Sequence, residues 1–346
     1  MRVVEVRAFG GVERLEDAER PMPVPGRGEV RIRIQAAGFN PVDYKWRQGP
    51  GGPPLPVVLG REVSGMVDAV GEGVTAFREG DAVFAYLGAQ ASNGGYAEAL
   101  CVQEVLVAHK PASLSFAEAA AIPVASLTAY DTVVEKARVE RGEAVFVAGA
   151  AGGVGSAAVG LLRHLGATPL LVTAGSDASA AYLVKELGVR PEDVVRYAGK
   201  GTKALAAELR ERTGGWGVAA AFDFVGGAMK RLCFDTVAAD GRVVSIVEEP
   251  PDYPLNLWDE DTSPLMVRSV SFHFVQLGAR ARLGPPSSWV SYGQRLAKLA
   301  ALYETGALPR PRVERVGSLS SASARRAHTL LEEGHVRGKL VMEGAA

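Results

Sequence analysis

The feature that most constrains the fold is a regular alternation of short apolar runs and longer helix-forming stretches after residue 143. Short apolar runs are typical of buried strands, and the stretches between them have the composition of helices. We predict strands over 143–149, 168–173, 193–197, 218–224, 241–247 and 269–275, and helices over 153–165, 178–187, 203–212 and 227–237. Such alternation predicts an α/β fold with a parallel sheet, and six strands complete a dinucleotide-binding (Rossmann) domain.

A glycine-rich turn, AGAAGGVG, follows the first of these strands. Ala150, Gly152 and Gly155 occupy the three positions of the G-x-G-x-x-G pattern, so the first glycine is replaced by alanine. Glycines let the backbone approach a pyrophosphate closely, and the following helix presents free N–H groups and the positive end of its dipole. Strand, turn and helix together predict a dinucleotide site.

The end of the second predicted strand bears on the choice of nucleotide. An NAD site usually has Asp or Glu there, bonded to the ribose 2′-hydroxyl. Here the strand ends in Thr173-Ala174-Gly175-Ser176, which is small and neutral and can admit a 2′-phosphate, so we favour NADPH. Asp177 follows at once where Arg or Lys would favour a phosphate, and it keeps NADH open. Tyr197, after the third predicted strand, is a candidate for the same adenosine pocket.

The first third of the chain has the character of a β domain. The segments VVEVRAF, EVRIRIQAAGF, VSGMVDAVG, DAVFAYLG and AEALCVQ are predicted short strands separated by Gly-containing turns. They indicate a small barrel-like β unit. Near the C-terminus we predict a loop over 277–288, a helix in YGQRLAKLAALYETG, a strand near 312–316, a helix in SASARRAHTLLEEG and a strand in GKLVME.

Composition excludes several classes of function. The formal net charge of −1 gives no field that attracts nucleic acid or an anionic membrane, and no apolar run is long enough to span a bilayer. Two cysteines, Cys101 and Cys233, exclude a disulfide framework and a multi-cysteine zinc lobe, and they fit a reducing cytoplasm. We see no signal-peptide pattern at the N-terminus. No metal site is expected, because the histidines lack ligand spacing: His109, His164, His273, His328 and His335.

Several segments, taken in order, resemble one family over nearly the whole chain. They are AAGFNPVDYKWRQG, LGREVSGMVDAVGEGVTAFREGDAVFA, GGYAEAL, AIPVASLTAY, GAAGGVGSAAV and GHVRGKLVM. The chain is similar to the medium-chain dehydrogenase/reductase superfamily, and within it to the zinc-free quinone oxidoreductases of the zeta-crystallin-like branch. The zinc-dependent members carry a Cys ligand where this chain has Asn40, and Gly-His-Glu where it has Gly60-Arg61-Glu62.

The resemblance implies a Rossmann dinucleotide-binding domain inserted in a GroES-like β-barrel domain, with the active site in the cleft between them. The expected boundaries are 1–121 for the GroES-like catalytic domain, 122–277 for the Rossmann domain and 278–346 for the return to the catalytic domain. Relatives commonly pair as dimers through edge strands of the nucleotide sheets. For this chain that implies a homodimer, with 269–275 as the apolar edge.

The resemblance also implies roles for single residues. Asn40 matches an asparagine beside the nicotinamide ribose, and Tyr44 is our candidate for binding the substrate oxygen; Asn40 and Tyr44 are the candidate catalytic pair. Solvent can also deliver the proton, since the family often lacks a dedicated acid. Candidate cofactor-binding residues are Asn40, Thr128, Gly152, Gly153, Val154, Gly155, Thr173, Ser176, Tyr197 and Lys339.

Three functions stay open at this point. The leading hypothesis is an NADPH-dependent reductase of a quinone or an α,β-unsaturated carbonyl (enone), because hydride addition to a conjugated acceptor needs no zinc. The first alternative is an enoyl-thioester reductase, with arginines of loop 277–288 meeting a phosphate of coenzyme A or phosphopantetheine. The second is a non-catalytic NADPH-binding sensor or structural protein.

Overall fold

The computed structural model describes residues 1–49, 51–88, 94–254, 265–334 and 336–344. The chain divides into two compact units. Unit 1 comprises Met1–Leu127, Leu277–Gly306 and Arg310–Ala346, and unit 2 comprises Thr128–Gln276 and Ala307–Pro309. Unit 1 is therefore built from both ends of the chain. The compact units do not test where separately folding domains begin and end, so the boundaries expected from the sequence remain a proposal.

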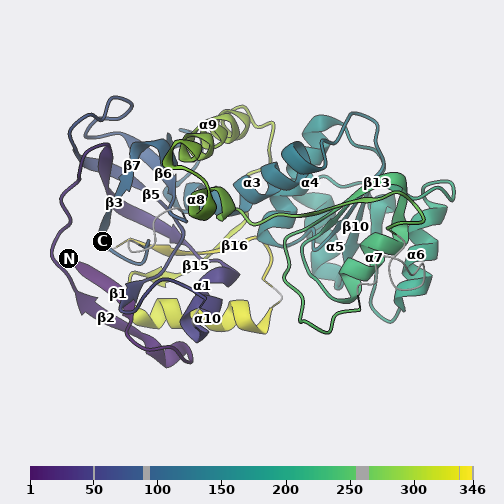
Figure 1. Cartoon of the computed structure of the whole chain (residues 1–346), viewed down its shortest axis with the longest axis horizontal. Helices are drawn as coiled ribbons and strands as arrows, with labels where there is room; N and C mark the ends of the chain where they lie inside the picture. The colour runs from purple at the N-terminus through teal and green to yellow at the C-terminus, as the bar shows by residue number, and fades with distance from the viewer. Residues whose placement is uncertain (50, 89–93, 255–264, 335, 345–346) are drawn as a thin grey trace. The chain divides into compact units, whose positions relative to one another are not determined.

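Unit 1 is built on two sheets (Figure 1). A seven-stranded sheet has the order β15-β16-β3-β5-β6-β8, with β7 also paired to β3, and a three-stranded sheet has the order β2-β1-β4. The strands are β1 (Arg2–Val6), β2 (Leu15–Glu19), β3 (Glu29–Gly38), β4 (Val57–Val58), β5 (Glu62–Val70), β6 (Ala82–Tyr86), β7 (Ala99–Gln103), β8 (Val107–His109), β15 (Val313–Ser318) and β16 (Lys339–Glu343). This confirms the GroES-like β domain.

The alternation in β3 explains its place at the centre of that sheet. Val30, Ile32 and Ile34 are buried on one face. Arg31 and Arg33 point to the other face and form ion pairs with Asp68. Side chains in a strand alternate between faces, so this sequence covers a core on one side only.

The first two helices of unit 1 begin at recognisable signals. The helices are α1 (Pro41–Gln48), α2 (Phe116–Ala120), α8 (Ala279–Leu283), α9 (Val290–Glu304) and α10 (Ser321–Glu333), while α3 (Pro123–Tyr130) runs across the boundary of the two units. Pro41 opens α1, where its missing N–H and fixed φ cost nothing. Ser115 and Glu118 form a capping box at α2.

Unit 2 contains a six-stranded sheet with the order β11-β10-β9-β12-β13-β14, in which every pairing is parallel. Its strands are β9 (Val145–Ala148), β10 (Leu170–Ala174), β11 (Val194–Arg196), β12 (Val218–Asp223), β13 (Val237–Ser245) and β14 (Ser271–Phe274). In chain order within the unit this is 3-2-1-4-5-6, the strand order of a Rossmann fold. The predicted fold class is confirmed.

Helices cover both faces of this sheet. They are α4 (Gly153–Leu165), α5 (Asp177–Lys185), α6 (Thr202–Glu211) and α7 (Ala228–Thr236), and a π-helical segment spans Asp131–Lys136. All four residues of β9 are fully buried, which requires cover on each face. On one face Phe146 packs in a core with Leu205 and Leu209 of α6 and with Leu232 and Phe234 of α7.

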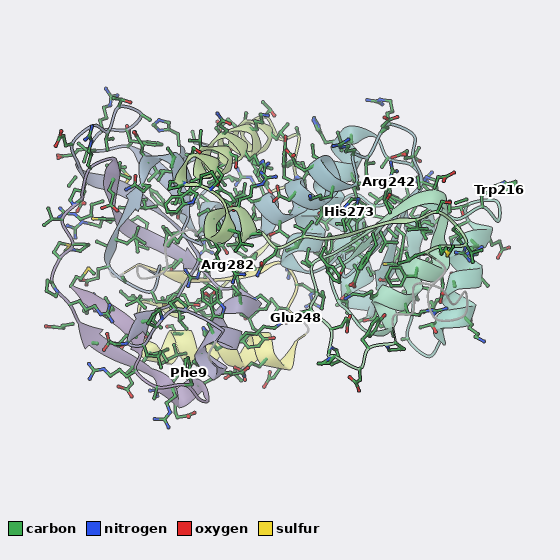
Figure 2. All side chains as sticks on the ribbon, viewed as in Figure 1. Phe9, Trp216, Arg242, Glu248, His273 and Arg282 are labelled. Atoms are coloured by element: carbon green, nitrogen blue, oxygen red, sulfur yellow. The ribbon has the colours of Figure 1, made fainter. Side chains whose placement is uncertain are left out.

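One prediction about the C-terminal part is wrong. Residues 277–288, expected as a loop, contain the short helix α8, which carries Arg282 (Figure 2), and the beginning of a 3₁₀ turn at Pro286–Trp289. A five-residue helix shows less than two turns of periodicity, so the sequence gives little signal for it. No helix in the described ranges combines the length and the apolar character needed to cross a membrane.

Candidate functional site

The glycine turn after β9 is shaped so that its backbone is accessible at one residue and tightly packed at another. A Cβ on Gly155 would lie 2.1 Å from the Gly149 oxygen, so only glycine fits where α4 packs into the turn. A Cβ on Gly152 would meet just one atom within 4 Å, the Gly149 oxygen at 3.4 Å. Gly152 is the N-cap of α4, and the first helical amides have no partner inside the helix. This open backbone at a helix N-terminus fits the pyrophosphate of a dinucleotide.

The end of β10 lies beside this turn, because β10 and β9 pair in parallel. Thr173 is buried within β10, and Ser176 is the N-cap of α5, where its Oγ accepts from the Ser179 amide at 3.1 Å. The Tyr197 hydroxyl lies against the backbone of Gly175, since a Cβ there would be 2.3 Å from it. Thr173, Ser176 and Tyr197 thus gather at the same end of the sheet as the glycine turn.

An arginine that sequence reasoning missed stands at this strand end. Arg196 is the last residue of β11, and its Nη1 donates to the Ser176 carbonyl oxygen at 2.8 Å. Its Nη2 forms an ion pair with Asp177 Oδ1 at 2.6 Å. The basic group that the sequence lacks directly after Ser176 is therefore supplied by the neighbouring strand.

A buried lysine holds the segments that follow β12 and β13. The Lys230 ammonium lies 2.8 Å from Glu249 Oε1, donates to the Val247 oxygen at 2.8 Å and lies 3.8 Å from Asp223 Oδ2. Asp223 also accepts from the Ser245 hydroxyl at 2.7 Å. Both loops lie at the carboxyl end of the sheet, where open α/β sheets bind ligands.

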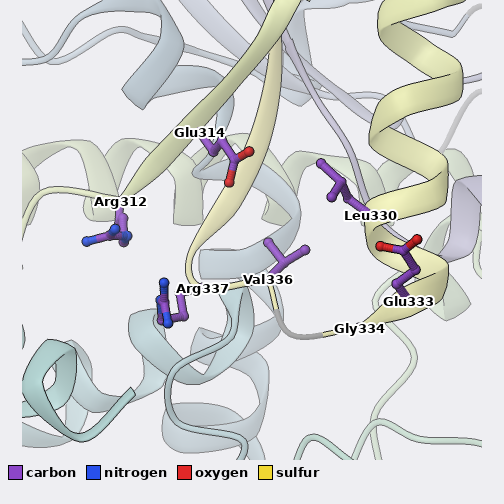
Figure 3. Close-up of a pocket in the computed structure, with 7 residues that line it drawn as sticks. All are labelled: Arg312, Glu314, Leu330, Glu333, Gly334, Val336 and Arg337. Carbon is purple, nitrogen blue, oxygen red and sulfur yellow. The ribbon is translucent and has the colours of Figure 1, made fainter. Parts of the chain in front are cut away.

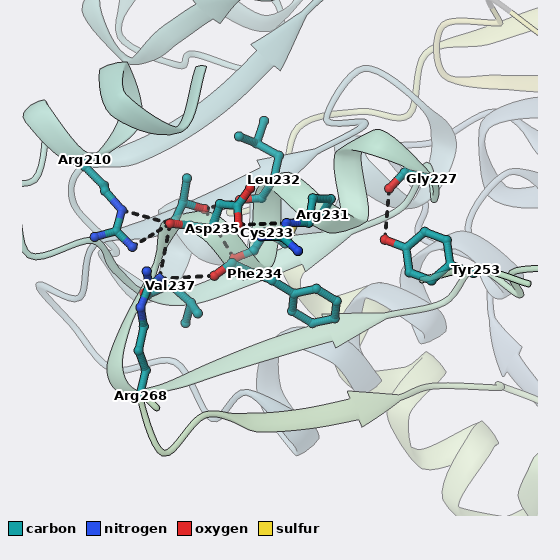
Figure 4. Close-up of polar contacts among 11 residues, drawn as sticks. Arg210, Gly227, Arg231, Leu232, Cys233, Phe234, Asp235, Val237, Tyr253 and Arg268 are labelled. Carbon is teal, nitrogen blue, oxygen red and sulfur yellow. Dashed lines mark hydrogen bonds and ion pairs between the residues drawn. The ribbon is translucent and has the colours of Figure 1, made fainter. Parts of the chain in front are cut away.

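Further hydrogen bonds hold both ends of α7 in place (Figure 4). At the C-terminal end, Arg210 donates to the Asp235 oxygen at 2.8 and 2.6 Å, and Arg268 donates to the Val237 oxygen at 3.1 Å. Cations here complement the helix dipole and the last carbonyl groups. At the N-terminal end the Tyr253 hydroxyl donates to the Gly227 oxygen at 3.2 Å.

In unit 1, Asn40 and Lys339 meet in a buried polar network with Glu62. The Lys339 ammonium lies 2.5 Å from Glu62 Oε1 and donates to Asn40 Oδ1 at 2.6 Å and to the Phe39 oxygen at 2.7 Å. Asn40 Nδ2 donates to Glu62 Oε1 at 2.9 Å. Within the described residues these contacts use all three ammonium hydrogens and leave one of the two side-chain amide hydrogens of Asn40 to donate elsewhere. The network therefore fixes which way the Asn40 amide points.

The same network decides whether a zinc ion fits. The resemblance puts the zinc ligands of metal-dependent relatives at Asn40 and Arg61. Arg61 is buried, with its guanidinium 3.8 Å from the centre of the Trp46 ring, and a guanidinium offers no lone pair to a metal. The Asn40 amide is bonded to Glu62 and Lys339, whose ammonium would repel a dication. These residues do not fit zinc, which prefers thiolate, imidazole and carboxylate ligands.

Among the described residues, no group of three or more His, Cys, Asp and Glu side chains could hold a metal ion. His335 lies outside the described residues. Burial raises the pKa of Cys101 to about 11, so that thiol is a packing group within β7.

Helix α1 carries Tyr44 and two buried ionisable residues, Asp43 and Arg47. Asp43 Oδ2 accepts from the backbone N–H of Asn40 at 2.9 Å, and its Oδ1 accepts from the backbone N–H of Gly60 at 3.2 Å. Burial raises the pKa of Asp43 to about 6 although the nearby Arg61 charge opposes this. Tyr44 is half-buried, and burial followed by the Glu332 charge raises the pKa of its hydroxyl.

A second buried chain of polar groups joins α1 to α10. Arg47 Nη1 lies 3.5 Å from His328 Nδ1, and the Tyr96 hydroxyl lies 3.2 Å from His328 Nε2. Since a guanidinium only donates, Nδ1 accepts and Nε2 carries the hydrogen that faces Tyr96. Arg47 also pairs with Glu332. Burial and the Arg47 charge lower the pKa of His328 to about 3.

A hollow of about 260 Å³ lies at the C-terminal end of α10 (Figure 3). Two basic and two acidic side chains are among its lining residues, Arg312, Glu314, Leu330, Glu333, Gly334, Val336 and Arg337. None of the residues predicted for the site lines it. Its mixed charge favours no single class of ligand.

The predicted residues thus fall into two sets. Gly152, Gly153, Val154, Gly155, Thr173, Ser176 and Tyr197 lie at one end of the unit 2 sheet, while Asn40, Tyr44 and Lys339 lie in unit 1. Thr128 is a buried residue of α3. Sequence reasoning missed Glu62, although a charged residue opening a buried strand is a usable signal, and it missed Asp43 in α1. It also missed Arg196, whose position depends on strand register.

Comparisons with known proteins agree with this geometry. Residues 26–112 match the family described as alcohol dehydrogenase GroES-like domain, and residues 192–342 match the family described as zinc-binding dehydrogenase. A 2-methylene-furan-3-one reductase of Solanum lycopersicum is 33% identical over 344 residues, covering 96% of this chain and 76% of the relative.

Two further relatives extend the comparison. The quinone oxidoreductase of Homo sapiens is 39% identical over 180 residues, so the match spans 51% of this chain and about half (54%) of that relative. A mycobacterial protein whose structure was solved in complex with NADPH is 31% identical, with a TM-score of 0.80 and coverage of 99% of this chain and 100% of the other. The chain therefore belongs to the medium-chain dehydrogenase/reductase superfamily of oxidoreductases, in its quinone oxidoreductase branch.

Proposed function

We propose that this protein is an NADPH-dependent oxidoreductase that transfers hydride to a quinone or an α,β-unsaturated carbonyl without zinc. The observation that carries the proposal is the buried hydrogen-bonded network of Asn40, Glu62 and Lys339. It stands at a position where metal-dependent relatives have a zinc ligand, in a chain that keeps an open glycine turn. The relatives named as quinone and enone reductases support the acceptor class.

The chemistry of a conjugated acceptor suits such a site. NADPH held at the glycine turn of Gly152 and Gly155 would supply a hydride for the electron-poor carbon of the acceptor, whose carbonyl oxygen would take up the electron pair, and a proton from solvent would complete the product. The developing oxyanion requires hydrogen-bond donors rather than a Lewis acid. In unit 1 we assign such donor roles to the remaining amide hydrogen of Asn40 and to the Tyr44 hydroxyl.

NADPH is proposed rather than NADH because the end of β10 is small and neutral. Thr173, Gly175 and Ser176 place no acidic side chain within the strand end. The mycobacterial neighbour solved with NADPH supports this choice. A cytoplasmic location stays an expectation from the use of two cysteines.

The test is a calorimetric titration of the purified protein with NADPH and with NADH, followed by consumption of the tighter nucleotide with 1,4-benzoquinone and with crotonyl-coenzyme A. We expect tighter NADPH binding and reduction of benzoquinone. Turnover of crotonyl-coenzyme A alone would instead indicate an enoyl-thioester reductase. Tight binding with neither acceptor reduced would favour a non-catalytic NADPH-binding protein, and absence of nucleotide binding would refute the proposal.

A further inference from the structure

The carboxyl ends of β10 and β11 bring one basic group to the place where a Rossmann fold distinguishes its nucleotides. In the parallel register Ala174 of β10 lies opposite Arg196 of β11, the last residue of each strand. The residue after the second strand of such a fold meets the ribose 2′-position, and a nearby arginine accommodates a 2′-phosphate. Arg196 therefore ends its strand beside that position.

The contacts of Arg196 hold its guanidinium over the first turn of α5. Nη1 donates to the Ser176 oxygen at 2.8 Å, and Nη2 contacts Asp177 Oδ1 at 2.6 Å. These contacts use two of the five N–H groups of a guanidinium, so three remain for a ligand. The Asp177 carboxylate is fully exposed and the Arg196 side chain is 37% exposed, so solvent and ligands reach both.

We propose that Arg196 binds the 2′-phosphate of NADPH and determines the preference for NADPH over NADH, with Asp177 as the group it pairs with when no phosphate is present. The inference rests on the proposed function, because it names the residue that reads the nucleotide of that site. It answers the difficulty that Asp177 raises, since the ion pair neutralises the carboxylate that would otherwise repel a phosphate.

The exchange of partners is favourable on physical grounds. An exposed arginine–carboxylate pair contributes little, because water screens it and ordering two side chains costs entropy. A phosphate carries more charge and accepts two parallel N–H bonds from one guanidinium. The N-terminus of α5 adds the positive end of a helix dipole, and the hydroxyls of Ser176 and Tyr197 lie at the same strand end.

The test compares the wild-type chain with the variants Arg196→Gln, Arg196→Lys and Asp177→Asn by calorimetric titration. The ligands are NADPH, NADH, adenosine 2′,5′-bisphosphate and 5′-AMP, of which the last two differ only in the 2′-phosphate. For Arg196→Gln we expect NADPH and the bisphosphate to bind about tenfold to a hundredfold more weakly, with NADH and 5′-AMP changed less than about twofold. Arg196→Lys should restore part of the loss.

Arg190→Gln is the matched control. Arg190 precedes the other end of β11, and its exposed side chain pairs with the buried Asp193, so this change removes the same charge. It should leave both NADPH and NADH binding unchanged. Asp177→Asn should tighten NADPH binding a few-fold, because the competing carboxylate is gone. Far-UV circular dichroism should match the wild type for all variants, and so should the melting temperature of the Arg196 and Asp177 variants, whose side chains are exposed. A lower melting temperature is expected only for Arg190→Gln, because the buried Asp193 loses its cation.

The outcomes separate this inference from the proposed function. Wild-type binding of NADPH together with an unchanged NADPH-to-NADH ratio in Arg196→Gln would overturn the role of Arg196 and leave the proposed function standing. An Asp177→Asn variant that loses NADH affinity while Arg196→Gln loses none for NADPH would assign the ribose to Asp177 instead. If wild-type protein binds neither nucleotide, the proposed function fails, and this inference fails with it.

Discussion

Lys339 is buried, with 7% of its surface exposed. Its ammonium forms an ion pair with Glu62, whose side chain is fully buried. A buried ion pair costs desolvation on both sides, so its value lies in the arrangement it enforces. Here that arrangement orients the Asn40 amide, with the oxygen toward Lys339 and one amide hydrogen toward Glu62. The remaining side-chain amide hydrogen of Asn40 is thereby preorganised to donate to a ligand.

Replacing Lys339 by Met is expected to destabilise the protein by about 3–5 kcal/mol, because it leaves the Glu62 carboxylate buried without its cation. Urea unfolding followed by circular dichroism measures the loss. Lys45→Met is the control, since Lys45 is exposed on α1 and its removal should change the free energy of unfolding by less than about 0.5 kcal/mol. Equal effects of the two changes would show that the Glu62 pair does not matter.

His328 makes stability depend on pH in a definite direction. Its pKa is about 3 in the folded protein, lowered by burial and by Arg47, against an ordinary value of 6.5. The unfolded chain therefore binds a proton at a higher pH than the folded chain does. The contribution of His328 is complete above pH 6.5 and is lost progressively as the pH falls toward 3.

Between pH 7.5 and pH 5 this loss amounts to about 2 kcal/mol, from 1.5 pH units at about 1.4 kcal/mol each. We expect the wild type to lose that much more than His328→Gln over the same interval, measured by urea unfolding at both pH values. Comparing the two proteins removes the contribution of Asp43, whose raised pKa acts in the opposite direction in both. Parallel pH profiles would contradict the assignment.

At the scale of elements, the turn between β9 and α4 separates a structural glycine from one whose backbone is open. Gly155 is enclosed by the Gly149 oxygen and by the Ala150 Cα, at 2.1 and 2.7 Å from a built Cβ. Gly152 has an ordinary extended conformation, φ −76° and ψ 177°, and almost nothing near its Cβ position. The two glycines should therefore respond differently to alanine.

Gly155→Ala is expected to lower stability by about 1–3 kcal/mol or more, since backbone atoms cannot move away from the added methyl group. Gly152→Ala should fold with a melting temperature near that of the wild type but bind NADPH at least tenfold more weakly, because the methyl group would occupy space left for the pyrophosphate. Thermal melts and calorimetry measure the two effects. Wild-type NADPH binding by Gly152→Ala would remove the pyrophosphate from this turn.

The same elements show what the sequence can predict. The glycine turn, the strand before it and α4 are local, and their residues alone specify them; α4 spans the predicted 153–165. Arg196 and Ser176 are 20 residues apart and meet only because Ala174 pairs with Arg196 in the sheet. Asn40, Glu62 and Lys339 lie still farther apart in the chain. No periodicity encodes such a register, so the contacts of Arg196 and of Glu62 could not be assigned from pattern alone.

At the scale of the whole molecule, β14 ends the order of strands in the described sheet of unit 2. It pairs with β13 on one side, and its second row of backbone N–H and C=O groups has no partner strand in that sheet. Phe274, its last residue, is 62% exposed. An exposed apolar edge strand is a template for pairing with another chain, which is the arrangement that we expect for a homodimer.

We expect the wild type to run as a dimer in size-exclusion chromatography with light scattering, and Phe274→Asp to shift it toward monomer. In an isologous dimer each copy presents the same strand, so the change places two carboxylates near one twofold axis and removes apolar contact from both sides at once. Trp216→Asp is the matched control: Trp216 is 85% exposed and lies just before β12, away from the strand edge at β14 (Figure 2). If Trp216→Asp dissociates the dimer and Phe274→Asp does not, the two copies meet elsewhere on unit 2. A wild type that is monomeric at all concentrations would show that the exposed edge of β14 is tolerated without a partner.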